Sequence, residues 1–530
     1  MRPIRAILAA AALAALPVVA PAFAQTPDDV LVIANRIDDI TSLDPAESFE
    51  FAGSDVLRNV YGNLVNFDPE NLEAGYQPDL AESWEVSDDG MSITFTMRDG
   101  ITFHSGNPVR AEDAEFSLER VVKLNLTPSF ILTQFGFTPE NVEEKITVEG
   151  STVTLELDKP YAESFVLNVL TATVGSIVDK ELVLKNEADG DLGNNWLKTN
   201  SAGSYAYKLA QWRPAEVVVL EANPDFYEGA PAMQRVIVRH ITESANQRLL
   251  LERGDIDVAR DLNPEDVAGI EGAEGIKVTD ELRGRIMYVG LNQQNEALAN
   301  PQVVEALKYA VDYEGMANSF LKGQFAIHQT FLPQTYFGAL DATPYSFDLE
   351  KAQALIEESG VETPVTLGVG VRDAQERIEI AQSLQNTFGE LGLNLDITVG
   401  TGAQTLAKYR ARELDVYVGE WGPDYPDPNT NAATFAYNPD NTDEANATGL
   451  LAWRNSYDPG ELTRKTEAAV TEGDTEARRQ MYEEMQQEFL DTAPFIIMFQ
   501  QIEQAAMKEN VEGLSLGQAI TAVSYWNVTK

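Results

Sequence analysis

The chain has 530 residues, enough for three or four domains, and its 44% hydrophobic and 9% aromatic content can form large cores. It contains no cysteine, which excludes disulfides, thiol nucleophiles and a lipidated N-terminal cysteine, and its three histidines are too few for most histidine-rich metal centres. The formal net charge of -46 disfavours binding to nucleic acids or anionic membranes. Such acidity fits solubility in a saline habitat, or attraction of cationic ligands.

The first 24 residues have the pattern of an export signal. Arg2 and Arg5 precede an apolar run at residues 6–20, and residues 22–24 form an Ala-x-Ala cleavage site. We therefore expect cleavage after Ala24, a mature chain from Gln25, and a periplasmic protein without a membrane anchor.

The mature chain opens with a short apolar strand at residues 31–34 and a loop at residues 44–51. A helix is expected next, with Val56, Val60 and Leu64 on one face. The order of a strand, a loop and a helix is typical of an α/β unit.

The pattern of apolar and polar residues changes at about residue 68. A turn at residues 88–90 leads into residues 92–97, where apolar and polar side chains alternate as in a half-buried strand. A short strand is expected at residues 101–103, a helix at 111–122 and a hairpin at 146–157. These features predict a small antiparallel unit with helices, inserted into the first domain.

The remaining chain again alternates strands and helices. Strands are expected at residues 217–220, 236–238 and 393–399, and helices at 244–253 and after Asn300, with Pro301 at the first helical position. A capping box is expected at residues 373–376. Repeated strand–helix units favour mostly parallel sheets whose loops meet at a common crevice.

Four segments in order resemble the extracellular solute-binding proteins of the oligopeptide/dipeptide-binding family, family 5, the receptors of ABC importers. The segments are LAESWEVSDDG at residues 80–90 with its continuation to residue 113, VLEANPDFY at 219–227, YVGLN at 288–292 and WGPDYPDP at 421–428. Together they extend across nearly the whole mature chain.

The resemblance implies an α/β periplasmic binding protein with two lobes, an extra inserted domain and a hinge of two crossing strands. We expect lobe 1 to comprise residues 25–67, 203–285 and 498–530, the inserted unit residues 68–202, and lobe 2 residues 286–497. The hinge strands are expected near residues 285–291 and 495–499, where apolar segments could bend as ligand closes the lobes.

Asp424 is the leading candidate for contact with a ligand. The resemblance implies that an aspartate three residues after a tryptophan pairs with the ammonium group of a bound peptide, and Trp421 and Asp424 match that spacing. A buried ammonium requires a compensating carboxylate. The alternatives are that Asp424 caps the turn at residues 424–427 and that Trp421 packs in the core.

Further candidates surround the same expected crevice. The resemblance places Phe49, Glu50 and Phe51 in a loop beside the ligand backbone, with packing against another loop as the alternative. Arg372, at the end of an expected strand, could bind a ligand carboxylate as a fork, or be solvated. Two departures from relatives are expected to affect the pocket. Tyr205 and Ala206 replace a glycine–proline pair that many relatives have, and Gly402 replaces a bulky residue found in some peptide binders.

The expected function is a periplasmic receptor, a monomer that binds a small peptide and delivers it to an ABC permease in the inner membrane. An oligosaccharide, an opine or a metal chelate is the alternative ligand. The rival class is a secreted hydrolase, but no Gly-x-Ser-x-Gly or His-Glu-x-x-His motif occurs. We therefore expect no catalytic residues, no cofactor and no resident metal.

Overall fold

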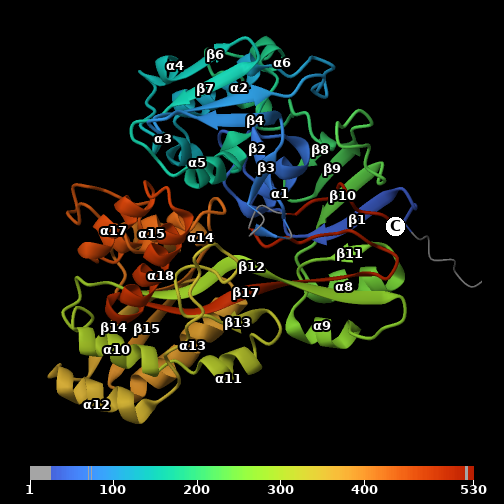
Figure 1. Ribbon diagram of the computed structural model, residues 1–530. Coiled ribbons are helices and arrows are strands. Elements are labelled where there is room, and N and C mark those ends of the chain that lie inside the picture. The colour runs from blue at the N-terminus through green and yellow to red at the C-terminus, as the bar shows by residue number, and fades with distance from the viewer. Residues whose placement is uncertain (1–25, 70, 73–74, 520–522) are drawn as a thin grey trace, which may run out of the picture.

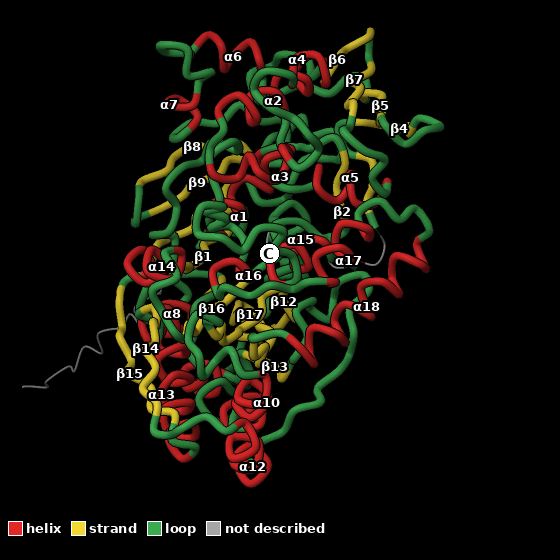
Figure 2. The backbone as a smooth tube through the Cα atoms, turned by 90° about the vertical axis from the view of Figure 1, so that its left-hand side faces the viewer, coloured by secondary structure: helices red, strands yellow, loops and turns green. Residues whose placement is uncertain are grey.

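The computed structural model describes residues 26–69, 71–72, 75–519 and 523–530. The expected signal peptide, its cleavage site after Ala24 and Gln25 lie outside these residues. Figure 1 shows β1, β10, α8 and α9 on the right, α10, α12 and α13 at the lower left, and β4, β6 and β7 at the top, and Figure 2 gives the view from the side. We call these three regions lobe 1, lobe 2 and the inserted unit.

One mixed sheet of 11 strands extends through both lobes. Its strands lie in the order β15 (Leu393–Gly400), β14 (Val365–Arg372), β16 (Val416–Trp421), β12 (Ile276–Leu291), β17 (Phe495–Lys508), β11 (Val258–Ala259), β1 (Val30–Asn35), β10 (Arg235–His240), β9 (Val217–Ala222) and β8 (Tyr207–Arg213), with β13 (Phe325–Ile327) also paired to β17. This arrangement confirms the predicted α/β fold class.

The expectation of mostly parallel sheets is wrong. Within the large sheet, parallel pairing joins β1 to β10 and β11, and β14 to β15 and β16. Between these two groups the pairing is antiparallel: β16 pairs with β12, β12 with β17, and β17 with β11. Helical connections predicted parallel pairing between strands that are close in the sequence. The two longest strands, β12 and β17, lie more than 200 residues apart, so no local pattern indicated that they pair antiparallel.

Helices cover the sheet in both lobes. Lobe 1 contains α1 (Phe51–Val60), α8 (Ser244–Arg253) and α9 (Pro264–Ile270). Lobe 2 contains α10 (Pro301–Tyr309), α11 (Tyr313–Asn318), α12 (Leu349–Ser359), α13 (Gln375–Glu390), α14 (Gly402–Arg410), α15 (Asn429–Phe435), α16 (Leu451–Arg454), α17 (Glu461–Ala469) and α18 (Thr475–Thr492). Along β12, Met287 and Val289 belong to one buried cluster and Ile286 and Tyr288 to another, so both faces of this strand pack against apolar side chains.

The inserted unit has its own four-stranded antiparallel sheet and apolar core. The sheet runs β4 (Ala81–Val86), β5 (Ser92–Met97), β7 (Thr152–Glu156) and β6 (Ile146–Glu149). Its helices are α2 (Ala111–Leu124), α3 (Phe130–Thr133), α4 (Val142–Lys145), α5 (Glu163–Leu170), α6 (Lys180–Lys185) and α7 (Asn194–Leu197), and the short pair β2 (Val65–Phe67) and β3 (Tyr76–Pro78) lies beside lobe 1.

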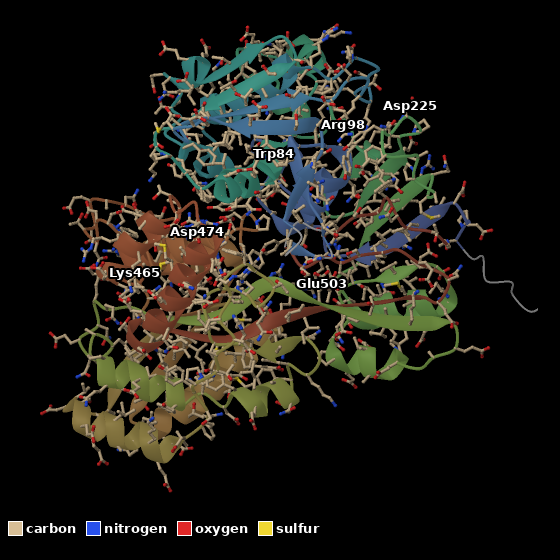
Figure 3. The ribbon with its side chains drawn as sticks, viewed as in Figure 1. Trp84, Arg98, Asp225, Lys465, Asp474 and Glu503 are labelled. Carbon is tan, nitrogen blue, oxygen red and sulfur yellow. The ribbon has the colours of Figure 1, made fainter. Side chains whose placement is uncertain are left out.

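Strands β12 and β17 are longer than expected and link the two lobes. In Figure 3, Glu503 marks the stretch of β17 between lobe 1 and lobe 2. The pairing of β12 with β17 is interrupted between Leu282 and Ile286, where their register shifts. This irregularity places the side chains of residues 283–285 outside a regular ladder, at the junction of the lobes.

Three local expectations differ from the structure. The first helix ends at Val60, before Leu64, and residues 101–103 form only one bridge, from Thr102 to Pro108. The capping box at residues 373–376 is absent. The Asp373 amide instead donates to the Gly400 carbonyl at 2.9 Å, and α13 starts at Gln375 with Ala374 as a cap residue that supplies no side-chain hydrogen bond.

Candidate functional site

Asp424 lies in the loop between β16 and α15. Its backbone N–H donates to Thr430 Oγ1 at 3.0 Å, while its carboxylate makes no hydrogen bond or ion pair with any described residue. Burial raises the pKa of Asp424 to about 7, and no nearby cation offsets this effect. The side chain is therefore a desolvated acceptor that lacks a partner.

The alternative role of Asp424, capping the turn, is filled by Asp427 instead. Asp427 Oδ1 accepts the N–H of Asn429 at 2.9 Å, and its carboxylate forms a fully buried bidentate pair with Arg478 at 2.8 and 2.9 Å. Asp427 thus fixes the loop, and Asp424 remains available to a ligand.

Several buried polar atoms of Trp421, at the end of β16, and of residues 335–336 lack a hydrogen-bond partner in the described structure. They include the indole Nε1 of Trp421, the hydroxyl of Tyr336 and Oγ1 of Thr335. Burial, and to a smaller extent the charge of Asp424, raises the pKa of Tyr336, so that its hydroxyl stays protonated as a donor. Unsatisfied buried polar groups are rare in native proteins, and a ligand is one way to pair them.

Trp421 has both a packing and a polar aspect. It is the last residue of β16, and its ring packs edge-on against Phe435 at 6.5 Å. Core packing, the alternative considered for Trp421, therefore applies to its ring, while its buried Nε1 has no hydrogen-bond partner among the described residues.

Arg285 contacts both Phe51 of α1 and Glu420 of β16, next to the loop that carries Asp424. The Arg285 guanidinium lies 4.0 Å from the centre of the Phe51 ring, a cation–π contact between β12 and the start of α1. Glu420, one residue before Trp421, is its nearest carboxylate, at 3.9 Å. Neither Arg285 nor Glu420 was predicted from the sequence, although residue 285 falls in the expected hinge segment.

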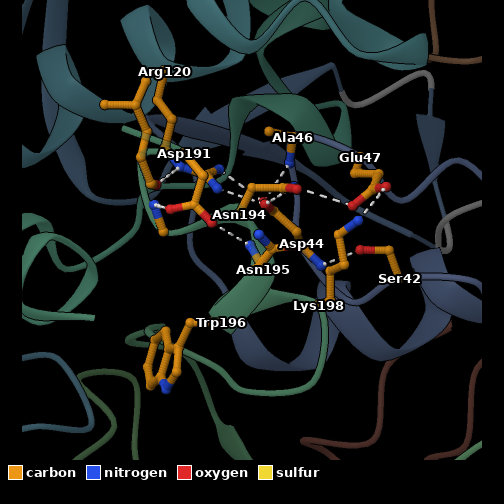
Figure 4. Close-up of polar contacts among 12 residues, drawn as sticks. Ser42, Asp44, Ala46, Glu47, Arg120, Asp191, Asn194, Asn195, Trp196 and Lys198 are labelled. Carbon is orange, nitrogen blue, oxygen red and sulfur yellow. Dashed lines mark hydrogen bonds and ion pairs between the residues drawn. The ribbon is translucent and has the colours of Figure 1, made fainter. Parts of the chain in front are cut away.

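The loop that carries Phe49, Glu50 and Phe51 is anchored to the inserted unit (Figure 4). The buried Asp44 carboxylate accepts hydrogen bonds from Arg120 at 2.7 and 2.5 Å and from Asn194 at 2.8 Å. These contacts fix the start of the loop that leads to Phe51.

Phe49 and Glu50 contact other parts of the protein. Phe49 packs edge-on at 5.8 Å against Phe130, which is the first residue of the helix α3 and not part of a loop. The Glu50 carboxylate accepts the hydroxyl of Thr41 and the N–H of Phe49, each at 3.1 Å. Of the three, Phe51 contacts a charged side chain of β12.

The other predicted residues form no hydrogen bond or ion pair with Asp424 in the described structure. Arg372 acts on the neighbouring Glu420, since burial raises the pKa of Glu420 but the charges of Arg377, Arg285 and Arg372 lower it. Arg372 is exposed, and its guanidinium lies over Gly402, where a side-chain carbon would approach its Nε to 2.8 Å. Tyr205 packs against Phe226 at 4.7 Å and lines a cavity of about 360 Å³ in lobe 1, whose lining contains none of the residues around Asp424. The structure thus groups Asp424, Trp421 and Phe51 and separates Tyr205 from them.

The inserted unit touches lobe 2 directly behind the Asp424 loop. Arg478 donates to Ser164 Oγ at 3.3 Å, and Asn168 donates to Asp427 Oδ2 at 3.4 Å. Nearby, the Ala162 N–H donates to the carbonyl of Val470 at 2.8 Å. Residues 162–168 of the inserted unit therefore contact the segments that hold the Asp424 loop in place.

Across the described ranges, no three His, Asp or Glu side chains gather in a way that could hold a metal ion. Within the same residues, no helix combines the length and apolarity required to cross a bilayer.

Comparison with known proteins identifies the family. The model of the bacterial extracellular solute-binding proteins, family 5 middle region, matches residues 75–443. The chain is 29% identical to the "Probable D,D-dipeptide-binding periplasmic protein DdpA" of Escherichia coli K12, over 93% of this chain and 92% of that protein.

Solved structures share the fold. The periplasmic binding protein DppA of Helicobacter pylori, in complex with the peptide STSA, superposes with a TM-score of 0.79 at 22% identity, covering 94% of this chain and 98% of DppA. NikZ of Campylobacter jejuni, in complex with Ni(L-His), gives 0.77 at 23% identity, covering 95% and 100%. The family match covers well over half of the sequence, so the chain belongs to the bacterial extracellular solute-binding proteins of family 5.

Proposed function

We propose that this protein is the periplasmic receptor of an ABC importer and that it captures short peptides, whose α-ammonium group pairs with Asp424. The observation that carries the proposal is the Asp424 carboxylate, desolvated yet unpaired among the described residues, with the donors of Trp421 and Tyr336 unsatisfied nearby. An ammonium group would restore the missing charge, and the peptide backbone would accept the free donors. The dipeptide and peptide ligands named for DdpA and DppA support the same ligand class.

The proposed mechanism is closure on ligand without chemical conversion. Ligand contacts with both lobes are complete only when they meet, so that binding shifts the population towards the closed form by its differential affinity. The closed monomer then docks on an inner-membrane permease. The division into lobe 1, the inserted unit and lobe 2, and export with cleavage after Ala24, belong to the same proposal.

A thermal-shift screen of residues 25–530 tests the ligand class. The panel contains D-Ala-D-Ala, L-Ala-L-Ala, tri- and tetra-alanine, an opine, an oligosaccharide and Ni(L-His). A ligand at one hundred times its dissociation constant adds about 2.7 kcal/mol to the free energy of unfolding. We expect a shift with peptides that Asp424→Asn removes and Asp396→Asn, an exposed aspartate of lobe 2, retains.

The two parts of the proposal fail separately. Shifts with the opine, the saccharide or the chelate, and none with peptides, would replace the ligand class. Peptide shifts of equal size in Asp424→Asn and the parent would remove Asp424 from the site.

A further inference from the structure

The inserted unit is firmly joined to lobe 1. The carboxylate of Asp44 pairs with Arg120 of α2, and these side chains are only 0% and 2% exposed. The apolar core of the inserted unit includes Leu64 of lobe 1, and the His104 N–H donates to the Gly203 carbonyl at 2.9 Å. Breaking a buried ion pair is strongly unfavourable, so these two parts move as one body.

A second interface joins the inserted unit to lobe 2. Tyr425 and Val470 of lobe 2 are buried in the apolar core of the inserted unit, whose other buried members lie between residues 46 and 177. The ring of Tyr425 packs edge-on against Phe165 of α5 at 6.2 Å. Figure 1 shows α5 directly above α15 and α17 of lobe 2. Two side chains of lobe 2 therefore complete a core that belongs to the other side of the hinge.

The polar contacts across this second interface are mostly long. Those between side chains exceed the usual hydrogen-bond distances of about 2.7–3.2 Å: Arg478 to Ser164 at 3.3 Å, Asn168 to Asp427 at 3.4 Å, and Tyr425 to Gln134 at 3.5 Å. The backbone bond from Ala162 to Val470, at 2.8 Å, has a normal length. A cavity of about 270 Å³ also remains between Ser164 and Asn168 on one side and Asp427 and Arg478 on the other. This interface is therefore looser than the joint with lobe 1.

The buried ion pairs beside this interface would survive its separation. Asp427 and Arg478 face the inserted unit, yet both belong to lobe 2 and pair with each other at 2.8 Å. The Asp44–Arg120 pair likewise lies wholly on the side of lobe 1 and the inserted unit. Separation would thus expose polar groups to water and cost mainly the apolar contacts of Tyr425 and Val470.

We propose that this interface is a latch: Tyr425 and Val470 enter the core of the inserted unit only when the lobes meet, and their burial stabilises the peptide-bound form. This inference rests on the proposed peptide-binding function and adds to it a role for the inserted unit. In the open receptor both side chains lie in water, so the affinity for a ligand includes the free energy of burying them. Because Tyr425 directly follows Asp424, the latch also holds the segment that carries the proposed ligand carboxylate.

Val470→Asn tests the latch without altering a residue of the proposed ligand site. An amide at this position would be hydrated in the open receptor and desolvated in the closed one. We expect the variant to bind L-Ala-L-Ala about 5- to 30-fold more weakly in calorimetry, chiefly through faster dissociation, with an unchanged melting temperature in the absence of ligand. Val399→Asn is the matched control, because Val399 is 46% exposed on β15, and it should bind like the parent. Tyr425→Phe keeps the ring and loses only the 3.5 Å contact, so it should bind within about twofold of the parent.

Spin labels measure the movement itself. The chain contains no cysteine, so two introduced thiols give a single labelled pair. Glu144→Cys on α4 and Glu467→Cys on α17 are exposed positions on the two sides of the interface. In the otherwise unchanged protein, saturating L-Ala-L-Ala should replace a longer label separation by a shorter one. With Val470→Asn added, part of the longer separation should remain at the same peptide concentration.

The outcomes separate the latch from the peptide function. If Val470→Asn binds L-Ala-L-Ala as tightly as Val399→Asn does, the latch is overturned and the peptide function stands. The same holds if peptide binds but leaves the label separation unchanged, a test that needs no interface variant and so does not depend on the folding of Val470→Asn. If Val470→Asn lowers the melting temperature equally with and without peptide, the contact is permanent packing and not a latch. If the parent binds no peptide of the panel, both proposals fall.

Discussion

The pH dependence of peptide binding follows from the state of Asp424. Its pKa of about 7 means that the carboxyl of the ligand-free protein is protonated over much of the acidic range. Only the carboxylate can pair with an ammonium, so binding below pH 7 must release a proton. We therefore expect the affinity for L-Ala-L-Ala to rise from pH 5 towards neutrality.

The size of the effect can be worked from two ionisations. At pH 5 about 1% of a group with a pKa near 7 is ionised, and at pH 7 about half is, while a peptide ammonium with a pKa near 7.8 stays mostly protonated. The affinity should rise about 40-fold between these pH values, equivalent to about 2.2 kcal/mol. Above pH 8 it should fall again, because the ligand loses its ammonium charge.

Stability should respond in the opposite direction in the absence of ligand. The pKa of Asp424 in the folded protein, about 7, lies above its ordinary value of 3.8. The folded state therefore binds the proton more tightly than the unfolded state, and the stability this contributes is fully present below pH 4 and is lost as the pH rises through 7. Asp424→Asn should therefore stabilise the ligand-free protein at pH 8 and change it little at pH 4. Because the side chain is partly exposed, the gain should be about 1–2 kcal/mol.

Calorimetry in buffers of different ionisation enthalpy measures both the affinity and the proton release. The parent should release nearly one proton per peptide at pH 5.5, and Asp424→Asn should release none. A dissociation constant that is flat from pH 5 to 7, or an equal slope in parent and variant, would refute the reasoning from desolvation.

Three further predictions concern the frame of the site. Arg478→Met strands the buried Asp427 and should lower the free energy of unfolding by about 3–5 kcal/mol in urea denaturation; a loss below 1 kcal/mol would contradict a structural role for the pair. Tyr205→Phe removes one long contact, 3.5 Å from Asn66, so calorimetry should give a peptide affinity within about twofold of the parent, and a larger loss would connect its cavity with the site. Gly203→Ala would place a carbon 2.0 Å from the Val60 carbonyl oxygen and should destabilise the protein by about 1–3 kcal/mol in thermal unfolding, whereas Gly389→Ala, in open space on α13, should not.

Local sequence patterns determined the elements that depend on near neighbours. The alternation at residues 92–97 and the turn at 88–90 correspond to β5 and its hairpin, and the predicted helix at 244–253 is α8. Asn300 caps α10 as expected, since its side chain accepts the N–H of Gln302 at 2.9 Å. These features depend on hydrogen bonds and burial that repeat within a few residues.

The sequence also indicated the family and singled out Asp424, because a tryptophan followed three residues later by an aspartate lies in one continuous motif. It could not show whether Asp424 or Asp427 closes the turn. That choice depends on Arg478, which lies 51 residues further along the chain and satisfies Asp427.

Tertiary structure alone decided which distant side chains meet. Arg285 joins Phe51 and Glu420 only because β12 pairs with β16 and crosses between the lobes, and a strand pattern contains no information about its long-range partners. The same pairing makes the sheet mixed where the helical connections favoured a parallel one. The sequence also could not distinguish Arg372 from Arg285 by side-chain type. In the fold Arg372 is exposed, whereas Arg285 has a buried Nε without a hydrogen-bond partner among the described residues.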